Sequence, residues 1–165
     1  MNVRAEANEA ALRLLHDHWA GNIPVEPKWI ARSLGIEVAG ADLDSRISGL
    51  IEYREGRARI HLNRGDHEVR QRFTLAHEIG HFVRNGESDF EYVDYRAGMA
   101  SKGTDPDEVF ANAFAAALLM PQTAVQELAE HGVSEKQMAR ELGVSTTAMV
   151  TRLKTLGWYP LPRAA

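Results

Sequence analysis

Cysteine is absent from the 165 residues of this chain. Its absence excludes disulfide bonds, thiolate nucleophiles and zinc sites built from cysteine sulfur. A chain without cysteine also fits a reducing compartment, where thiols have no structural role to play. We therefore expect a cytoplasmic protein.

Long hydrophobic runs are missing as well. No stretch reaches the roughly 20 apolar residues that a membrane-spanning helix requires. The first six residues, MNVRAE, are not followed by the apolar run of a secretory signal peptide. The sequence thus predicts a soluble protein that does not enter a membrane.

An excess of positive charge is the third absence, because the formal net charge is -4 at pH 7. Binding to nucleic acid depends on clustered lysine and arginine, so a nucleic-acid surface covering the whole protein is excluded, whereas a local basic patch is not. The apolar content of 44% over 165 residues is enough for one hydrophobic core with a small appended subdomain.

The most informative segment that is present is HEIGH, at residues 77–81. On a helix His77 and His81 lie one turn apart on the same side, so both imidazoles can bind a single zinc ion. Glu78 is rotated away from that pair but can reach a water molecule on the metal and act as general base. Hydrolytic metallopeptidases use this arrangement. The plain alternative is two ordinary histidines on an ordinary helix.

The surrounding residues predict a central helix over about 67–83, capped by Asp66. Two apolar stripes run along it, and the histidines project from a narrow polar strip shared with Arg70 and Thr74. Gly80 costs about 1 kcal/mol of helix propensity relative to alanine. Its presence predicts that another helix approaches the backbone closely at this point.

A catalytic zinc keeps three protein ligands and leaves the fourth position for water. The next helix, from Asp105 to Pro121, carries Glu108 on the same face as small alanines, which would let it pack tightly on the histidine helix. We predict Glu108 as the third ligand of one Zn²⁺ per chain, with Asn112 hydrogen-bonded to a histidine nitrogen. The alternative is that Glu108 only completes a capping box with Asp105.

Two blocks, RFTLAHEIGH at residues 72–81 and EVFANAFAAALLMP at residues 108–121, resemble the ImmA/IrrE family of zinc metallo-endopeptidases. With a similar entry helix and first strand upstream, the resemblance covers roughly residues 20–130. It implies a gluzincin-like site with His77, His81 and Glu108 on zinc and Glu78 as general base. It also implies a cytoplasmic enzyme of transcription regulation or stress response, which cleaves a helix-turn-helix repressor and so relieves repression.

The other elements predict an α+β fold, in which a small antiparallel three-stranded sheet packs on a zincin-type helical core. We expect helices over residues 5–19 and 27–34, and strands over residues 36–39, 49–54 and 57–62. An exposed sheet edge can hold an extended peptide by main-chain hydrogen bonds, and the strand at 57–62 is the predicted edge. Otherwise this edge is paired or covered, and another strand holds the peptide.

A polar segment without clear periodicity, residues 87–103, separates the two ligand helices and is predicted to be a loop lining the cleft. Tyr92, Tyr95 and His67 are candidates to hydrogen-bond the oxyanion that forms during peptide hydrolysis. For each of them, simple packing or a solvated surface position is the alternative.

The C-terminal part predicts two short helices, capped by Ser134 and Ser145 and joined by a turn at Gly143. We divide the chain into a metallopeptidase domain (1–132), a helix-turn-helix-like subdomain (133–157) and a tail (158–165). Arg152 and nearby threonines could face a DNA groove. Docking of the partner repressor, or closure of the core, are the other roles for these helices.

The sequence therefore favours a zinc endopeptidase whose substrate is a cytoplasmic protein, with neither DNA nor a membrane as its partner. A rival function is a non-catalytic or DNA-associated binding module, such as the partner-sequestering component of a toxin-antitoxin pair. In that case the metal would be structural or vestigial.

Overall fold

The computed structural model of the protein describes residues 2–86, 88, 90–95 and 105–161, without the side chains of 92–95. These residues form an α+β fold, as the sequence predicts. The helices are α1 (Val3–His18), α2 (Pro27–Ser33), α3 (Glu68–Asn85), α4 (Pro106–Leu119), α5 (Gln122–Glu130), α6 (Glu135–Leu142) and α7 (Thr146–Thr155). The strands are β1 (Glu37–Ala41), β2 (Ile47–Arg54), β3 (Arg57–Asn63) and β4 (Phe90–Tyr95).

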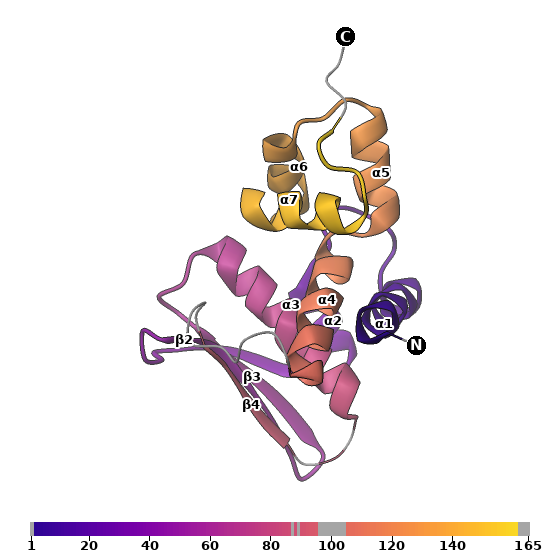
Figure 1. Cartoon of the computed structure of the whole chain (residues 1–165). Coiled ribbons are helices and arrows are strands. Elements are labelled where there is room, and N and C mark those ends of the chain that lie inside the picture. Colours follow the sequence, from indigo (N-terminus) through magenta and orange to yellow (C-terminus); the bar gives the residue numbers. More distant parts are fainter. Residues whose placement is uncertain (1, 87, 89, 96–104, 162–165) are drawn as a thin grey trace.

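The elements are arranged in layers around α3, which lies against one face of the sheet (Figure 1). Helix α4 packs on the side of α3 away from the sheet, and α1 packs on α4 in turn. Helices α5, α6 and α7 gather at the end of the molecule away from the sheet (Figure 1). None of the helices in the described part is long and apolar enough to cross a bilayer.

The sheet has four strands in the described residues, in the order β1-β3-β2-β4, and not the three antiparallel strands predicted. The additional strand, β4, pairs antiparallel with β2 and begins at Phe90, inside the segment predicted to be a loop. In addition, β1 runs parallel to β3, because β3 inserts between β1 and β2. The sheet is therefore mixed.

Strand β3 is an interior strand, so the prediction that residues 57–62 form the peptide-binding edge is wrong. Ile60 faces Val38 of β1 on one side and Ile51 of β2 on the other. Because both rows of main-chain groups are used by its neighbours, no peptide can pair with β3. In the described part of the chain the edges of the sheet are β1 and β4.

A tight turn at Glu55 and Gly56 joins β2 to β3, as the sequence predicts. Both residues have positive φ, 51° and 77°. A two-residue hairpin of the I′ type requires this geometry at both central positions, and its twist matches that of the flanking strands. The turn places Ile51 opposite Ile60, and both side chains are fully buried against the helices.

Helix α3 begins one residue later than predicted. Its N-cap is His67, which makes no side-chain capping bond, and not Asp66. Gln71 fixes the entry to the helix, because its Nε2 donates to the carbonyl oxygens of Asn63 and Asp66 at 3.1 and 3.0 Å. The start of α3 is thus attached to the end of β3.

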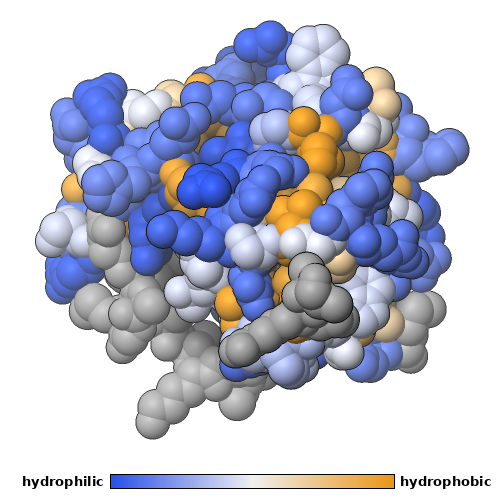
Figure 2. Space-filling view, turned by 90° about the horizontal axis from the view of Figure 1, so that it is seen from above, coloured by the Kyte–Doolittle hydropathy of each residue, from blue (hydrophilic) through white to orange (hydrophobic). Residues whose placement is uncertain are grey.

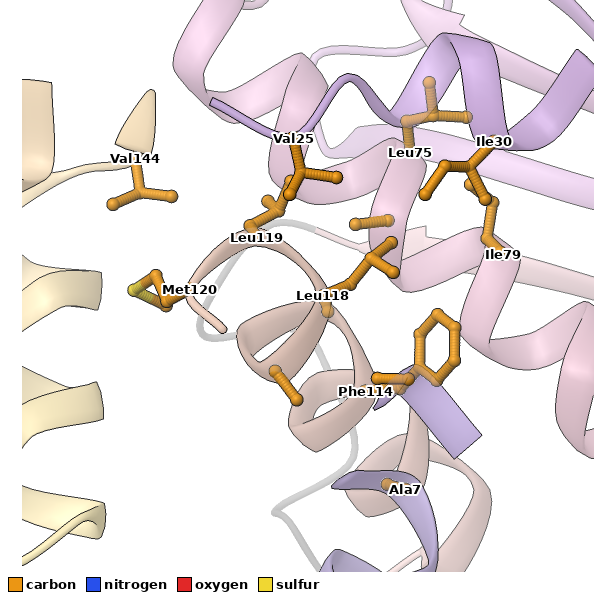
Figure 3. Close-up of a cluster of buried hydrophobic side chains, with 14 of the residues drawn as sticks. Ala7, Val25, Ile30, Leu75, Ile79, Phe114, Leu118, Leu119, Met120 and Val144 are labelled. Atoms are coloured by element: carbon orange, nitrogen blue, oxygen red, sulfur yellow. The ribbon is translucent and has the colours of Figure 1, made fainter. Parts of the chain in front are cut away.

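The close helix contact predicted at Gly80 is confirmed. A methyl group at this position would lie 3.0 Å from Cα of Ala111 and 3.2 Å from Cδ1 of Phe114. The absent side chain therefore lets the backbones of α3 and α4 approach each other. Figure 3 shows Phe114 and Ile79 on these two helices among the buried side chains of the core.

The hydrophobic core continues into the C-terminal helices. Met138, Leu142, Met149 and Leu153 are fully buried and belong to the same cluster as the side chains of α3 and α4. The outer face above these helices is mainly hydrophilic, with a short hydrophobic band (Figure 2). Apolar side chains of residues 133–157 are thus largely turned toward the rest of the protein.

The predicted C-terminal caps are confirmed: the hydroxyl of Ser134 accepts from the amide of Gln137, and that of Ser145 from the amide of Ala148. The structure does not support the alternative in which Arg152 faces a DNA groove. Only 5% of this residue is exposed. Its guanidinium donates to the Met120 carbonyl and to Oδ1 of Asn8, both at 3.1 Å, so it joins α7 to the core.

Candidate metal centre

Two helices bring three potential metal ligands together. His77 and His81 lie one turn apart on α3, and their Nε2 atoms are 3.1 Å apart. From α4, the carboxylate of Glu108 places one oxygen 3.5 Å from Nε2 of His77 and the other 3.2 Å from Nε2 of His81. This is the ligand set predicted from the sequence, and it is assembled where the two helices cross beside Gly80.

The spacing of these atoms fits a single metal ion. Zinc binds imidazole nitrogen and carboxylate oxygen at about 2.0–2.2 Å, and a tetrahedral angle between two such bonds separates the ligand atoms by roughly 3.3 Å. The observed separations of 3.1, 3.2 and 3.5 Å lie close to that value. Three protein ligands of this type leave room for a water molecule or a substrate oxygen.

Burial gives the ligand side chains the charge state that a metal needs. Both histidine side chains are almost completely buried, whereas 21% of the Glu108 side chain is exposed. Burial, followed by repulsion from His81, lowers the pKa of His77 to about 4. Hydrogen bonding with His81 lowers the pKa of Glu108. At neutral pH a carboxylate therefore faces an unprotonated imidazole, which favours a divalent cation.

Asn112 sets the orientation of the first histidine. It lies one turn beyond Glu108 on α4, and its Oδ1 is 3.1 Å from Nδ1 of His77. An amide oxygen can only accept, so Nδ1 of His77 carries the proton and Nε2 presents a lone pair toward His81 and Glu108. The structure thus places Asn112 as the sequence predicts.

The first turn of α4 shows where each of its acidic side chains points. Asp105 caps the helix by accepting from the amide of Asp107 at 2.9 Å, while the Glu108 carboxylate is directed at the histidines. Arg84, which the sequence reasoning missed, holds this turn against α3: its Nε donates to Asp107 at 3.2 Å and its Nη1 to Glu6 at 3.1 Å. Two features of the sequence could have indicated this role of Arg84: its positive charge and its position one turn after His81.

Glu78 is fully buried and lies on the side of α3 that faces β2. Gly49 of β2 is its neighbour there, since a methyl group on Gly49 would be 3.6 Å from Oε1 of Glu78. The register of β2 against β4 shifts between Ile47 and Gly49, so the regular pairing of the two strands is interrupted there. The sequence reasoning missed Gly49, although a glycine inside a strand often marks a close approach.

Of the three residues proposed for oxyanion stabilisation, only His67 has a described side chain, and it does not lie at the candidate ligands. His67 caps α3 ten residues before His77, which is about 15 Å along the helix axis. Tyr92 and Tyr95 belong to β4, but their side chains lie outside the described part of the structure. The predicted cleft loop, 87–103, also lies largely outside the described residues.

Comparison with known proteins gives two matches. Residues 31–154 match the family Peptidase_M78, described as the IrrE N-terminal-like domain. The chain is also 30% identical over 157 residues to the radiation response metalloprotease IrrE of Deinococcus radiodurans. That alignment covers 90% of this chain and 47% of the relative. The chain therefore spans about half the length of the curated relative that it matches.

Proposed function

The chain belongs to the Peptidase_M78 family, and from this membership and the site we propose that it is a zinc-dependent endopeptidase acting on a protein substrate. One observation carries the proposal: ligand atoms of His77 and His81, on the helix that also bears Glu78, and of Glu108 on α4 lie within 4.8 Å of one another. This donor set, with a carboxylate beside it, is the one used to hydrolyse peptide bonds.

His77, His81 and Glu108 would hold the zinc ion, which would supply Lewis acidity to the attacking water and the scissile carbonyl. The protein's own residues handle the protons. Glu78 takes a proton from the attacking water as the new carbon–oxygen bond forms. It then delivers that proton to the amine nitrogen as the carbon–nitrogen bond breaks. Asn112 keeps the proton of His77 on Nδ1, so that Nε2 stays available for the metal.

The substrate that we propose is a cytoplasmic helix-turn-helix repressor, whose cleavage relieves repression. The resemblance to ImmA/IrrE peptidases supports this choice, and so does a relative described as a radiation response metalloprotease. The rival DNA-associated module is weakened by the structure, because the arginine on which it was argued, Arg152, is buried and hydrogen-bonded to the core.

Glu78→Gln tests the proposal, because it removes the proposed base while keeping the shape of the side chain. We expect the variant to retain its zinc, to lose hydrolysis by about a thousandfold or more, and to capture the uncut partner from cells. Mass mapping of the captured partner after treatment with the wild type then locates the cleaved bond. The matched control is Glu68→Gln, an exposed glutamate on the same helix.

Two results would count against the proposed function. If the wild-type protein binds no zinc under zinc-replete conditions, the proposed zinc-dependent hydrolase activity is wrong. A Glu78→Gln variant that cleaves as fast as Glu68→Gln would remove Glu78 from the mechanism. If the variant loses cleavage but keeps its effect on transcription, the sequestering module is the correct function.

A further inference from the structure

A groove of about 550 Å³ runs along β1, at the edge of the sheet opposite β4. Its floor is formed by β1 itself together with the apolar side chains of Ile36 and Leu62. Helix α2 forms one wall with Lys28 and Arg32, while Arg64 and Gln71 also line the space. None of these residues belongs to the metal cluster, so the groove is a separate site.

Two positive charges on the groove wall are not neutralised. Lys28 and Arg32 are four residues apart on α2 and therefore project from the same side of the helix. Within the described part of the chain neither forms an ion pair, in contrast to Arg64, which contacts Asp42 at 3.2 Å. Two like charges at this spacing slightly destabilise a helix, and they stand out on a chain with a net charge of -4.

The carboxylate that lines the same groove does not cancel these charges. Glu37 is paired across the sheet with Arg59, at 3.0 Å. The two paired residues neutralise each other, so the groove keeps a net positive charge from Lys28 and Arg32. This local excess is where an anionic partner is attracted.

The main chain of β1 is available at this groove. Among the residues that the structure describes, β1 pairs only with β3. Ala39 and Gly40 are small and exposed, so they present no bulky side chain to an approaching strand. Arg64 donates to the Gly40 carbonyl at 3.0 Å, which occupies one acceptor near the end of the strand. An edge of this type binds extended peptides by strand addition.

We propose that this groove binds an extended acidic segment of a partner protein, whose main chain pairs with β1 and whose carboxylates contact Lys28 and Arg32. Nucleic acid fits less well, because two cations give little affinity for a phosphate backbone. The apolar floor also suits peptide side chains. The proposal concerns binding alone and stands whether or not the metal site hydrolyses peptides.

A peptide of alternating glutamate and threonine, ten residues long and labelled with fluorescein, is a suitable probe. In an extended strand alternate side chains point the same way, so all its glutamates can face α2. We expect saturable binding to the 165-residue protein by fluorescence anisotropy. Because anisotropy follows binding and not turnover, both wild type and Glu78→Gln should bind the probe equally well.

The test variant is Lys28→Glu/Arg32→Glu, with the milder Lys28→Gln/Arg32→Gln beside it in case the charge reversal disturbs α2. We expect the reversal to weaken binding by about tenfold or more and the neutral variant to weaken it less. The matched control is Lys136→Glu/Arg140→Glu, which changes the same two residue types, at the same spacing, on the exposed side of α6. The control should bind within about twofold of wild type.

Two further probes separate strand addition from simple charge attraction. The same peptide with methyl groups on alternate backbone amides cannot pair as a strand, and we expect it to bind at least about tenfold more weakly. In nuclear magnetic resonance spectra, the unmethylated peptide should shift the amide signals of Val38, Ala39 and Gly40 and leave those of α6 unchanged.

Several outcomes would overturn the proposal. If the α6 control loses binding to the same extent, the affinity for the probe depends only on the net charge of the protein. Undiminished binding of the methylated peptide would exclude strand addition, and displacement of the probe by short duplex DNA would make the groove a nucleic-acid site. If the protein dimerises and Lys28→Gln/Arg32→Gln abolishes the dimer, the groove binds a second copy of the chain instead. Absence of binding to wild type also counts against it.

Discussion

The backbone of Gly49 on β2 lies directly against the side chain of Thr74 on α3. A methyl group built on Gly49 would meet Cγ2 of Thr74 at 2.6 Å and the carbonyl oxygen of His61 at 3.1 Å. The first of these distances is far below ordinary van der Waals contact. Since the same methyl position is 3.6 Å from Oε1 of Glu78, this close fit between sheet and helix lies beside the proposed general base.

Gly49→Ala should therefore destabilise the protein and disturb the position of Glu78. We expect a loss of about 1–3 kcal/mol in the free energy of unfolding, from chemical denaturation. The turnover number of peptide cleavage should fall while zinc content stays the same. Thr74→Ser removes the colliding methyl group, so the double variant should recover part of both losses. Gly40→Ala, where the nearest atom is 3.5 Å away, is the control and should change stability little.

Glu108→Ala should remove one of three metal ligands. Zinc affinity, measured by competition with a chelator, should fall by about a hundredfold or more, and cleavage should fall with it. Glu127→Ala removes an exposed acid on the next helix, α5. That control should keep its zinc. If Glu108→Ala binds zinc as tightly as wild type, Glu108 is not a ligand.

The metal-free protein should lose stability as the pH falls from about 6.5 to 4. Because burial lowers the pKa of His77 from 6.5 to about 4, the unfolded chain binds a proton in this window that the folded chain does not. Stability thus rises with pH across the window, by roughly 3 kcal/mol in all. Urea denaturation with a chelator present measures this loss. His77→Gln should flatten the dependence, whereas His16→Gln, at an exposed ring, should not.

Arg152→Ala should lower the stability of the protein and leave its affinity for DNA unchanged. The change leaves the Met120 carbonyl and the Asn8 side chain without their donor, so we expect a loss of about 1–3 kcal/mol in the free energy of unfolding. Affinity for duplex DNA should stay negligible at physiological salt. Lys154→Ala, at an exposed position on the same helix, is the control. A steep salt-dependent DNA affinity that disappears only in Arg152→Ala would reverse this interpretation.

The two ligand helices could be predicted because several local signals agree there. Asp105 and Pro106 mark the start of α4 and Pro121 its end, and His77 and His81 can reach a single ion only if they lie on a helix. Gly80 carried tertiary information as well, since a glycine inside a helix implies a close neighbour. The sequence therefore predicted correctly the positions of residues that depend only on the helix to which they belong.

Strand pairing was predicted poorly, because it depends on contacts between distant segments. β4 begins at Phe90 in a polar segment without clear alternation, and it is a strand because β2 offers it an edge. Nothing local indicates that β3 would insert between β1 and β2. The burial of Arg152 could not be predicted for a similar reason, since the acceptors that let it be buried come from α1 and the end of α4.

The contact between Gly80 and Ala111 has a consequence for how the protein responds to metal supply. Helices α3 and α4 are held in van der Waals contact by their own backbones at this point, and the contact uses none of the candidate ligand side chains. Metal capture is then separate from folding, unlike in a zinc finger, whose chain is unfolded without its ion. We expect a chelator to leave a folded, inactive protein that regains activity within the time zinc takes to bind. The fraction of the protein that is active would then depend on the concentration of free zinc, and not only on synthesis of new protein.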